Sequence, residues 1–127
     1  PESARTPGAA RDALLMRVIG SPDPYGKQID GMGAATSSTS KTVIIGKSAR
    51  PDHDVDYLFG QVSIDQPFVD WSGNCGNLSA AVGPFAITNG LVDPARVPHN
   101  GVAVVPLLFI INCRVTATSR GMKQMFF

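Results

Sequence analysis

The segment that most constrains the fold is a nearly continuous apolar run over residues 78–87, LSAAVGPFAI. The run follows a turn of small residues at 72–77 (SGNCGN), and Gly90 follows as a stop signal. A surface helix keeps a polar face toward water, and this run has none. We therefore expect a short helix that starts just after Cys75 and is buried inside a wrap of strands.

A second helix is predicted near the start of the chain. Residues 9–19 carry apolar side chains at i, i+3 and i+4 spacing, and Gly20 and Pro22 follow as stop signals. Residues 21–40 then contain prolines, glycines and a TSSTS run with few apolar side chains. This composition predicts a loop whose backbone groups and hydroxyls are available for binding.

Strands are predicted in the remaining apolar segments. Residues 41–45 (KTVII) are rich in β-branched side chains, which favour a strand. Within residues 54–64, apolar side chains occupy the odd-numbered positions up to Phe59. After Gly60 they occupy the even-numbered positions, which predicts a strand with a kink at the glycine. Residues 102–111 predict a buried strand that is too short to span a bilayer, and residues 114–118 predict another.

Composition narrows the class of protein. Hydrophobic residues make up 43% of the 127 residues, which favours a folded domain over a disordered chain. The formal net charge is +1 and the basic residues are scattered, which argues against a nucleic-acid surface. Cys75 and Cys113 lack metal or redox spacing, so neither a disulfide nor a zinc site is favoured, and we expect a cytoplasmic protein. His53 lies among aspartates that we expect at a solvated surface rather than around a metal.

Cys75 is the most prominent candidate for chemistry. A thiol at a helix start feels the positive end of the helix dipole and nearby backbone N–H groups, which favour the thiolate. Gly73 and Gly76 allow a ligand to approach the backbone closely, and Asn74 and Asn77 supply amide donors for a substrate carboxylate. The alternative is a buried structural cysteine in a glycine-rich turn, and the local pattern leaves both interpretations open.

Lys41 is the second candidate. It follows five small residues at 36–40 (TSSTS), all of which bear hydroxyl groups. A lysine partly desolvated by strands can serve as a base. By itself, however, the pattern favours a solvated lysine that blocks pairing at a strand edge.

Three stretches together carry a specific resemblance. The helix at 9–19, residues 20–44 (GSPDPYGKQIDGMGAATSSTSKTVI) and residues 50–93, which contain SGNCGN, are similar to the PrpF family of 2-methylaconitate cis-trans isomerases. The resemblance implies an α/β (α+β) chain that forms one half of a diaminopimelate epimerase-like fold. In that fold a mixed or antiparallel sheet wraps around a central apolar helix, and the active site lies in the cleft between two pseudo-symmetric halves.

The resemblance also implies the site and the reaction. Lys41 and Cys75 would handle the protons, and no metal or organic cofactor would be needed. The substrate would be a small unsaturated tricarboxylate such as 2-methylaconitate, an intermediate of propionate catabolism in the methylcitrate cycle. The residues expected to bind its carboxylates are Ser37, Ser38, Thr39, Ser40, Asn74, Gly76 and Asn77.

Two alternatives stay open beside this interpretation. One is a keto-enol tautomerase of the 4-oxalomesaconate type, and the other is a non-catalytic fragment that self-associates through apolar strands. We expect residues 1–101 to form a partial N-terminal domain of the family fold and residues 102–127 a divergent tail. The expected partners are the small carboxylate and either further copies of the chain or a complementary second half, with no nucleic acid and no membrane.

Overall fold

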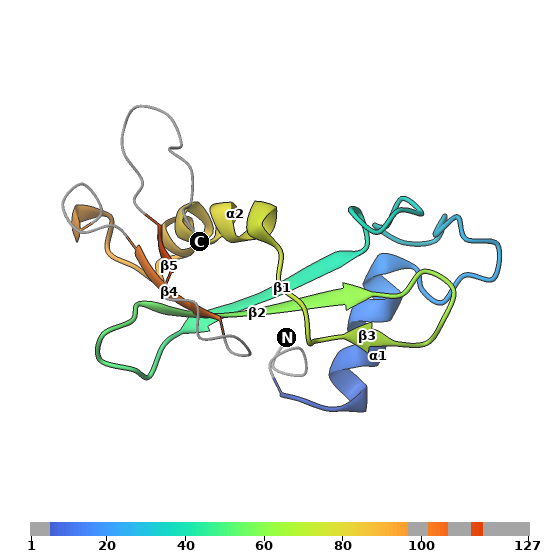
Figure 1. Cartoon of the computed structure of the whole chain (residues 1–127), viewed down its shortest axis with the longest axis horizontal. Helices are drawn as coiled ribbons and strands as arrows, with labels where there is room; N and C mark the ends of the chain where they lie inside the picture. Colours follow the sequence, from blue (N-terminus) through green and yellow to red (C-terminus); the bar gives the residue numbers. More distant parts are fainter. Residues whose placement is uncertain (1–5, 97–101, 107–112, 116–127) are drawn as a thin grey trace. The chain divides into compact units, whose positions relative to one another are not determined.

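The computed structural model describes residues 6–96, 102–106 and 113–115 as a mixed α/β chain (Figure 1). Its α/β class agrees with the prediction from the sequence. In chain order the elements are α1 (Ala9–Ile19), β1 (Lys41–Lys47), β2 (Val55–Val62), β3 (Val69–Asp70), α2 (Gly76–Thr88), the 3₁₀ turn η2 (Pro94–Arg96), β4 (Val102–Pro106) and β5 (Cys113–Val115). Among the described residues, neither helix has the length and apolar content that crossing a bilayer requires.

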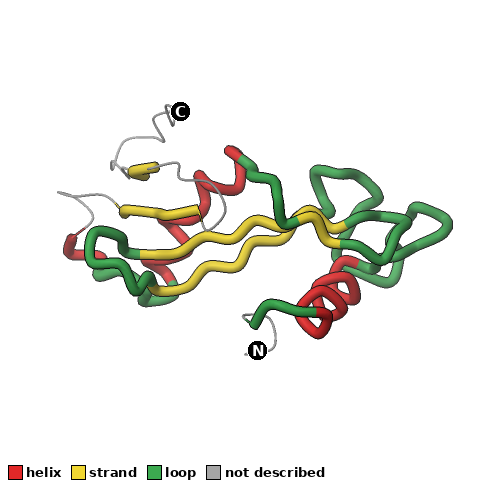
Figure 2. The backbone as a smooth tube through the Cα atoms, turned by 60° about the horizontal axis from the view of Figure 1, so that its bottom comes forward, coloured by secondary structure: helices red, strands yellow, loops and turns green. Residues whose placement is uncertain are grey.

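The strands form one five-stranded sheet in the order β1-β2-β4-β5, with β3 also paired to β2. The β2–β3 and β4–β5 pairs are antiparallel and the β2–β4 pair is parallel, so the sheet is mixed. Figure 2 shows the strands in yellow. The strand predicted at 102–111 is present as β4, and the part after residue 106 lies outside the described residues. The strand predicted at 114–118 overlaps β5, and its last residues also lie outside.

The chain divides into two compact units. The first contains residues 1–44 and 59–74, and the second contains residues 45–58 and 75–127. Strands β1 and β2 therefore contribute residues to both units. The domain boundary predicted near Gly101 stays a prediction.

In the first unit, helix α1 begins and ends at the predicted residues. Gly20 ends it in the left-handed conformation (φ 87°) that glycine adopts without a steric penalty. The core cluster consists of Ile19, Val62 and Val69, with Met16 and Trp71 packed against it.

Trp71 explains the shift in parity at Gly60. A Cβ atom on Gly60 would lie 2.8 Å from Cζ3 of Trp71, so a side chain at this position would overlap the space that the indole ring fills. The ring is fixed on its other sides as well. Arg11 stacks over it at 3.8 Å from the ring centroid, and Nε1 of Trp71 donates to Asp12 at 3.2 Å. Burial on β2 accordingly changes from alternate residues to the adjacent pair Phe59 and Gly60.

In the second unit, helix α2 is present where the apolar run predicted it, and it starts at Gly76, directly after Cys75 as predicted. The prediction that α2 is wholly buried is wrong for the described part of the chain. Only Val82, Gly83 and Ala86 are buried, whereas Phe85 is 47% exposed. The three buried positions share one helical face, so the chain around α2 covers one side of it and leaves the opposite apolar side exposed.

Candidate functional site

Cys75 is the N-cap residue of α2, with an extended backbone (φ −137°, ψ 111°). Its side chain is half-buried and forms no disulfide within the described part of the chain. The carbonyl of Cys75 accepts hydrogen bonds from the backbone N–H of Ser79 at 3.0 Å and from the Ser79 hydroxyl at 2.9 Å. Because the N–H groups of a first helical turn have no partner inside the helix, α2 presents backbone donors beside the thiol. This is the helix-start placement that the sequence predicted.

The predicted carboxylate-binding residues around Cys75 differ in exposure. Asn74 and Asn77 are exposed, and Gly76 is half-buried at the first position of α2. Gly73 packs closely on Phe59, because a Cβ atom on Gly73 would lie 3.2 Å from Cε1 of that ring. The absence of a side chain at Gly73 is thus needed for packing against Phe59.

Tyr57 is a neighbour of Cys75 that the sequence analysis missed. Its side chain is 2% exposed, and its hydroxyl has no hydrogen bond of ordinary geometry within the described part of the chain. Burial raises the pKa of the Tyr57 hydroxyl, and the nearby Ser79 hydroxyl opposes part of that rise. The strand alternation indicated burial of Tyr57, but no local signal placed it near the start of α2.

Lys41 is the first residue of β1 and is half-buried. In the run before it, Ser37 and Ser38 are exposed. Thr39 closes a turn on Thr36: its N–H donates to the Thr36 carbonyl at 3.2 Å, and the two hydroxyl oxygens lie 2.9 Å apart. The structure therefore gathers Lys41 and the predicted hydroxyl run at one place in the first unit.

Ser40 differs from the rest of the run because it is completely buried. The one hydrogen of its hydroxyl is shared between two acceptors, the side-chain oxygen of Gln28 at 3.0 Å and the Thr36 carbonyl at 2.8 Å. Its carbonyl accepts from the Val62 N–H at 2.9 Å and from Nε2 of Gln61 at 3.0 Å. The residue next to Lys41 is thus held through both its side chain and its backbone.

The predicted residues fall into one set in each unit. Lys41 and the hydroxyl run belong to the first unit with Asn74, and Cys75, Gly76 and Asn77 belong to the second. Within the described ranges no three histidine, cysteine or acidic residues are grouped as a metal site would require. His53 is more enclosed than expected, since its side chain is 12% exposed and its Nδ1 lies 2.6 Å from a carboxylate oxygen of Asp52.

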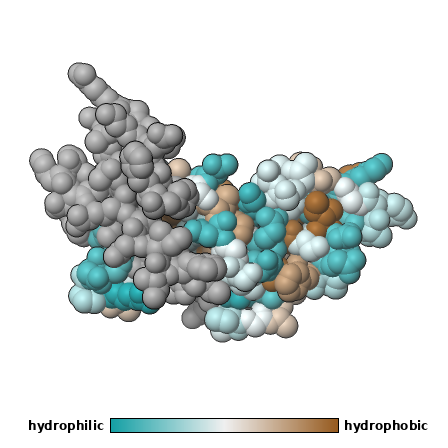
Figure 3. Space-filling view, viewed as in Figure 1, coloured by the Kyte–Doolittle hydropathy of each residue, from teal (hydrophilic) through white to brown (hydrophobic). Residues whose placement is uncertain are grey.

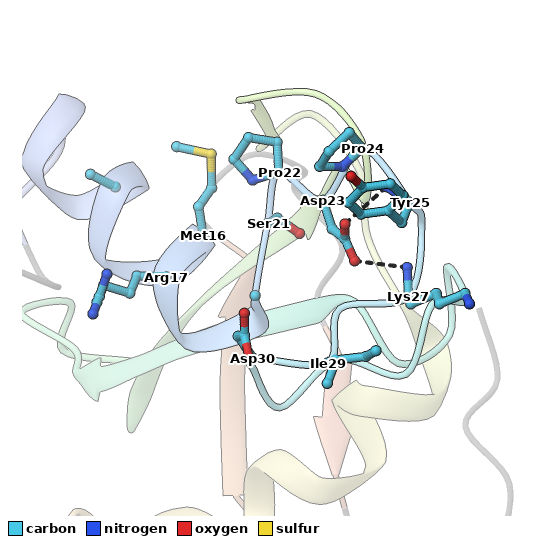
Figure 4. A pocket seen from close by; sticks show the side chains of 12 residues that line it. Met16, Arg17, Ser21, Pro22, Asp23, Pro24, Tyr25, Lys27, Ile29 and Asp30 are labelled. Carbon is cyan, nitrogen blue, oxygen red and sulfur yellow. Dashed lines mark hydrogen bonds between the residues drawn. The ribbon is translucent and has the colours of Figure 1, made fainter.

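A separate open pocket of about 1110 Å³ lies between α1 and the loop after it (Figure 4). Asp23 lies on its wall and accepts backbone hydrogen bonds from Tyr25, Lys27 and Gln28 at 2.7–2.9 Å. These bonds lower the pKa of the Asp23 carboxyl, that from Tyr25 having the largest effect. The pocket is lined by Ala13, Met16, Arg17, Gly20, Ser21, Pro22, Asp23, Pro24, Tyr25, Lys27, Ile29 and Asp30. Both charge signs are present, and neither proposed proton-transfer residue lies on its wall.

Two curated relatives are highly similar to the chain. The 2-methyl-aconitate isomerase of Cupriavidus necator is 89% identical over 105 residues, which are 83% of this chain and 26% of that protein. The 2-methyl-aconitate isomerase of Shewanella oneidensis is 77% identical over the same shares of each chain. The chain therefore spans about a quarter of the length of the curated relatives it matches.

A solved structure and a family model match the same group of proteins as these two relatives. The crystal structure of a methylitaconate-delta-isomerase superposes with a TM-score of 0.73 at 43% identity, covering 89% of this chain and 29% of that chain. The family model described as PrpF protein matches residues 1–119, so the family similarity continues into residues expected to form a divergent tail. The chain belongs to the PrpF protein family.

Proposed function

We propose that this chain carries the Lys41 and Cys75 segment of a cofactor-independent isomerase that acts on a small unsaturated tricarboxylate such as 2-methylaconitate. The observation that carries the proposal is the half-buried Cys75 at the N-cap of α2, in a chain 89% identical to a 2-methyl-aconitate isomerase. Both relatives described above have that name, which favours this substrate over an oxalomesaconate.

The proposed reaction is a proton transfer at carbon. One of the two residues, as base, removes a proton from a carbon conjugated with a carboxylate, and the electron pair delocalises into a dienolate-like anion. The isomer forms when the proton returns to the same carbon after rotation about the weakened double bond, or when the second residue gives a proton to another carbon. The proton removed equals the proton returned, so the reaction is balanced without an oxidant, a reductant or a cofactor.

The proposed substrate contacts divide by exposure. The exposed hydroxyls of Ser37 and Ser38 and the exposed amides of Asn74 and Asn77 are suited to direct contact with carboxylates. The N–H of Gly76 at the start of α2 is suited to stabilising the developing negative charge. Thr39 and Ser40, whose hydroxyls are engaged within the loop, contribute by holding the run in place.

Replacement of the cysteine tests this function. In the Cupriavidus necator enzyme, the 105 matching residues are replaced by those of this chain. The cis-trans interconversion of 2-methylaconitate by this protein is then followed by NMR or ultraviolet absorbance. We expect Cys75→Ala and Lys41→Met each to lower kcat by about 10²- to 10⁴-fold, the usual contribution of a general acid or base. The matched control is Lys47→Met, the same chemical change as Lys41→Met at the exposed last residue of β1. Full activity of Cys75→Ala would contradict the mechanism.

We further propose that the chain associates with another protein surface, either a second copy or the remainder of the family fold, and that it is cytoplasmic. Hydrophobic side chains reach the surface between hydrophilic ones (Figure 3). Phe68 is 59% exposed and Phe85 47% exposed, which supports association. We expect little turnover by the 127 residues alone, because the resemblance implies a site between two halves and the chain spans about a quarter of its relatives' length. Light scattering after size-exclusion chromatography tests association, and a monomer at every concentration would contradict it.

A further inference from the structure

Gln28 is a buried polar residue of the first unit; among its described polar residues only Ser40 is less exposed. It is 1% exposed and has a positive φ of 50°, which is uncommon for a residue with a side chain. It lies in the loop between α1 and β1, where the sequence predicts solvent-accessible polar groups. A buried amide in such a loop is stable only if its donors and acceptors are paired.

The amide of Gln28 is paired on both sides. Its Oε1 accepts from the backbone N–H of Ala35 at 2.9 Å and from the Ser40 hydroxyl at 3.0 Å, while its Nε2 donates to the Ser21 hydroxyl at 2.8 Å. The Ala35 N–H can only donate, so the oxygen of the amide must face it. This fixes the orientation of the amide, because in the flipped form its NH₂ group would face the Ala35 N–H, which cannot accept a hydrogen bond.

The loop is shaped around this amide. Gly33 has no room for a side chain, because a Cβ atom there would collide with Oε1 of Gln28. The N–H of Gly33 donates to the carbonyl of Ile19 at 3.0 Å, and the N–H of Met32 donates to that of Val18 at 2.8 Å. The end of α1, the loop and the Gln28 side chain therefore form one hydrogen-bonded frame.

The frame ends next to Lys41. Gln28 holds Ala35 and Ser40, the residues on either side of the turn at 36–39, and Ser40 is covalently joined to Lys41. The carbonyl of Ser40 is meanwhile tied to Val62 of β2. Loss of the Gln28 amide would remove the bonds from Ala35 and from the Ser40 hydroxyl, and would leave Ser40 attached through the Thr36 carbonyl and its own backbone.

We propose that Gln28 is a positioning residue for the isomerase, one that sets the hydroxyl run and the backbone of Lys41 for proton transfer. The proposal rests on the function proposed above. Gln28 does not touch the substrate and acts through Ala35 and Ser40. A merely structural role would lower stability alone, whereas a positioning role alters kcat at temperatures where the protein is folded.

Two measurements test the proposal. Activity is measured in the Cupriavidus necator enzyme carrying the 105 residues of this chain, and amide hydrogen exchange is measured on the chain itself. We expect Gln28→Leu to lower kcat roughly a hundredfold, as displacement of a reacting group by about 1 Å does, with a smaller change in KM. Exchange at the Ala35 amide should rise roughly tenfold with loss of its bond.

Gln28→Glu is the conservative variant, since it keeps an acceptor for Ala35 and Ser40 while the Ser21 hydroxyl can rotate to donate. It should restore kcat to within about tenfold of the parent enzyme. The matched control is Gln66→Leu, the same chemical change at an exposed glutamine of the same unit, and it should alter neither readout. Should Gln28→Leu not fold, Ser40→Ala removes one hydroxyl of the frame and should lower kcat about tenfold.

Parent-like kcat in folded Gln28→Leu would overturn the proposal whatever the exchange at Ala35, as would parent-like kcat in Ser40→Ala. If Lys41→Met retains full activity, the function proposed above fails. The exchange measurement then still decides whether Gln28 orders the loop, so the two failures are distinguishable.

Discussion

Gly60→Ala adds one methyl group at the point where β2 passes beneath Trp71. The new Cβ would lie 2.8 Å from Cζ3 and 3.1 Å from Cε3 of Trp71, and 3.0 Å from Cγ2 of Thr42. Carbon atoms pack best at about 3.5–4.0 Å, so the methyl group lies well inside the repulsive range. The ring cannot simply move away, because Arg11 stacks on it and Asp12 accepts its N–H.

Overpacking of this kind costs about 1–3 kcal/mol. Replacing glycine in a strand gains about 0.5–1 kcal/mol by reducing the freedom of the unfolded chain. We therefore expect Gly60→Ala to lower the free energy of unfolding by about 1–2 kcal/mol. Gly46→Ala is the matched control: Gly46 also lies in a strand, and no atom lies within 4 Å of its Cβ position, so that variant should be slightly more stable.

Urea unfolding followed by far-ultraviolet circular dichroism measures both variants. A double-mutant cycle with Trp71→Leu assigns the cause, since the smaller side chain removes the contact with the ring. Gly60→Ala should then cost at least about 0.5 kcal/mol less than in the parent chain. Equal costs in the two backgrounds would show that the indole ring is not the barrier and would refute the reasoning.

Three further predictions follow from side chains of the two units. The pKa of Asp23 is lowered by its backbone hydrogen bonds, so its contribution to stability is present above the ordinary aspartate pKa of about 3.9 and is lost as the pH falls through the lower folded value. Asp23→Asn should flatten the acid limb of a plot of unfolding free energy against pH, and an unchanged limb would contradict this. Trp71→Phe removes the bond to Asp12 and weakens the Arg11 stack, and should cost about 1–2 kcal/mol in urea unfolding. A loss below about 0.5 kcal/mol would show that these contacts contribute little. Tyr57→Phe removes a buried hydroxyl without a partner of ordinary geometry among the described residues, so thermal unfolding should show unchanged or slightly higher stability. A loss above about 1 kcal/mol would instead show that Ser79 binds this hydroxyl.

Local sequence patterns predicted the elements that carry the proposed site. Apolar spacing and stop signals located α1 residue for residue, and β-branched side chains located the strand that starts at Lys41. Small residues followed by an apolar run located Cys75 at a helix start. Each of these features depends on neighbours within a few positions, because helix and strand periodicity and capping are local properties.

Partners distant in sequence determined the rest of the site. Burial of Gln28 depends on Ser40, twelve positions away, and the setting of Trp71 depends on Asp12, fifty-nine positions away. A glutamine in a polar loop has no local pattern that indicates burial. The exposed side of α2 was missed for the same reason, since its composition indicates how much apolar surface it has but not how much of that surface the strands cover.

The sequence by itself thus determined the order of the two helices and of β1, β2, β4 and β5, but not β3 or η2. It also determined the places of Lys41 and Cys75 at element starts and the family to which the chain belongs. Only the tertiary structure decided which hydroxyls of the run remain exposed and which side chain holds the loop before Lys41. The physical reason is that secondary structure depends on backbone preferences and side-chain spacing, which are set by residues within a few positions of one another. Burial and hydrogen-bond pairing exist only after segments far apart in the chain have come together.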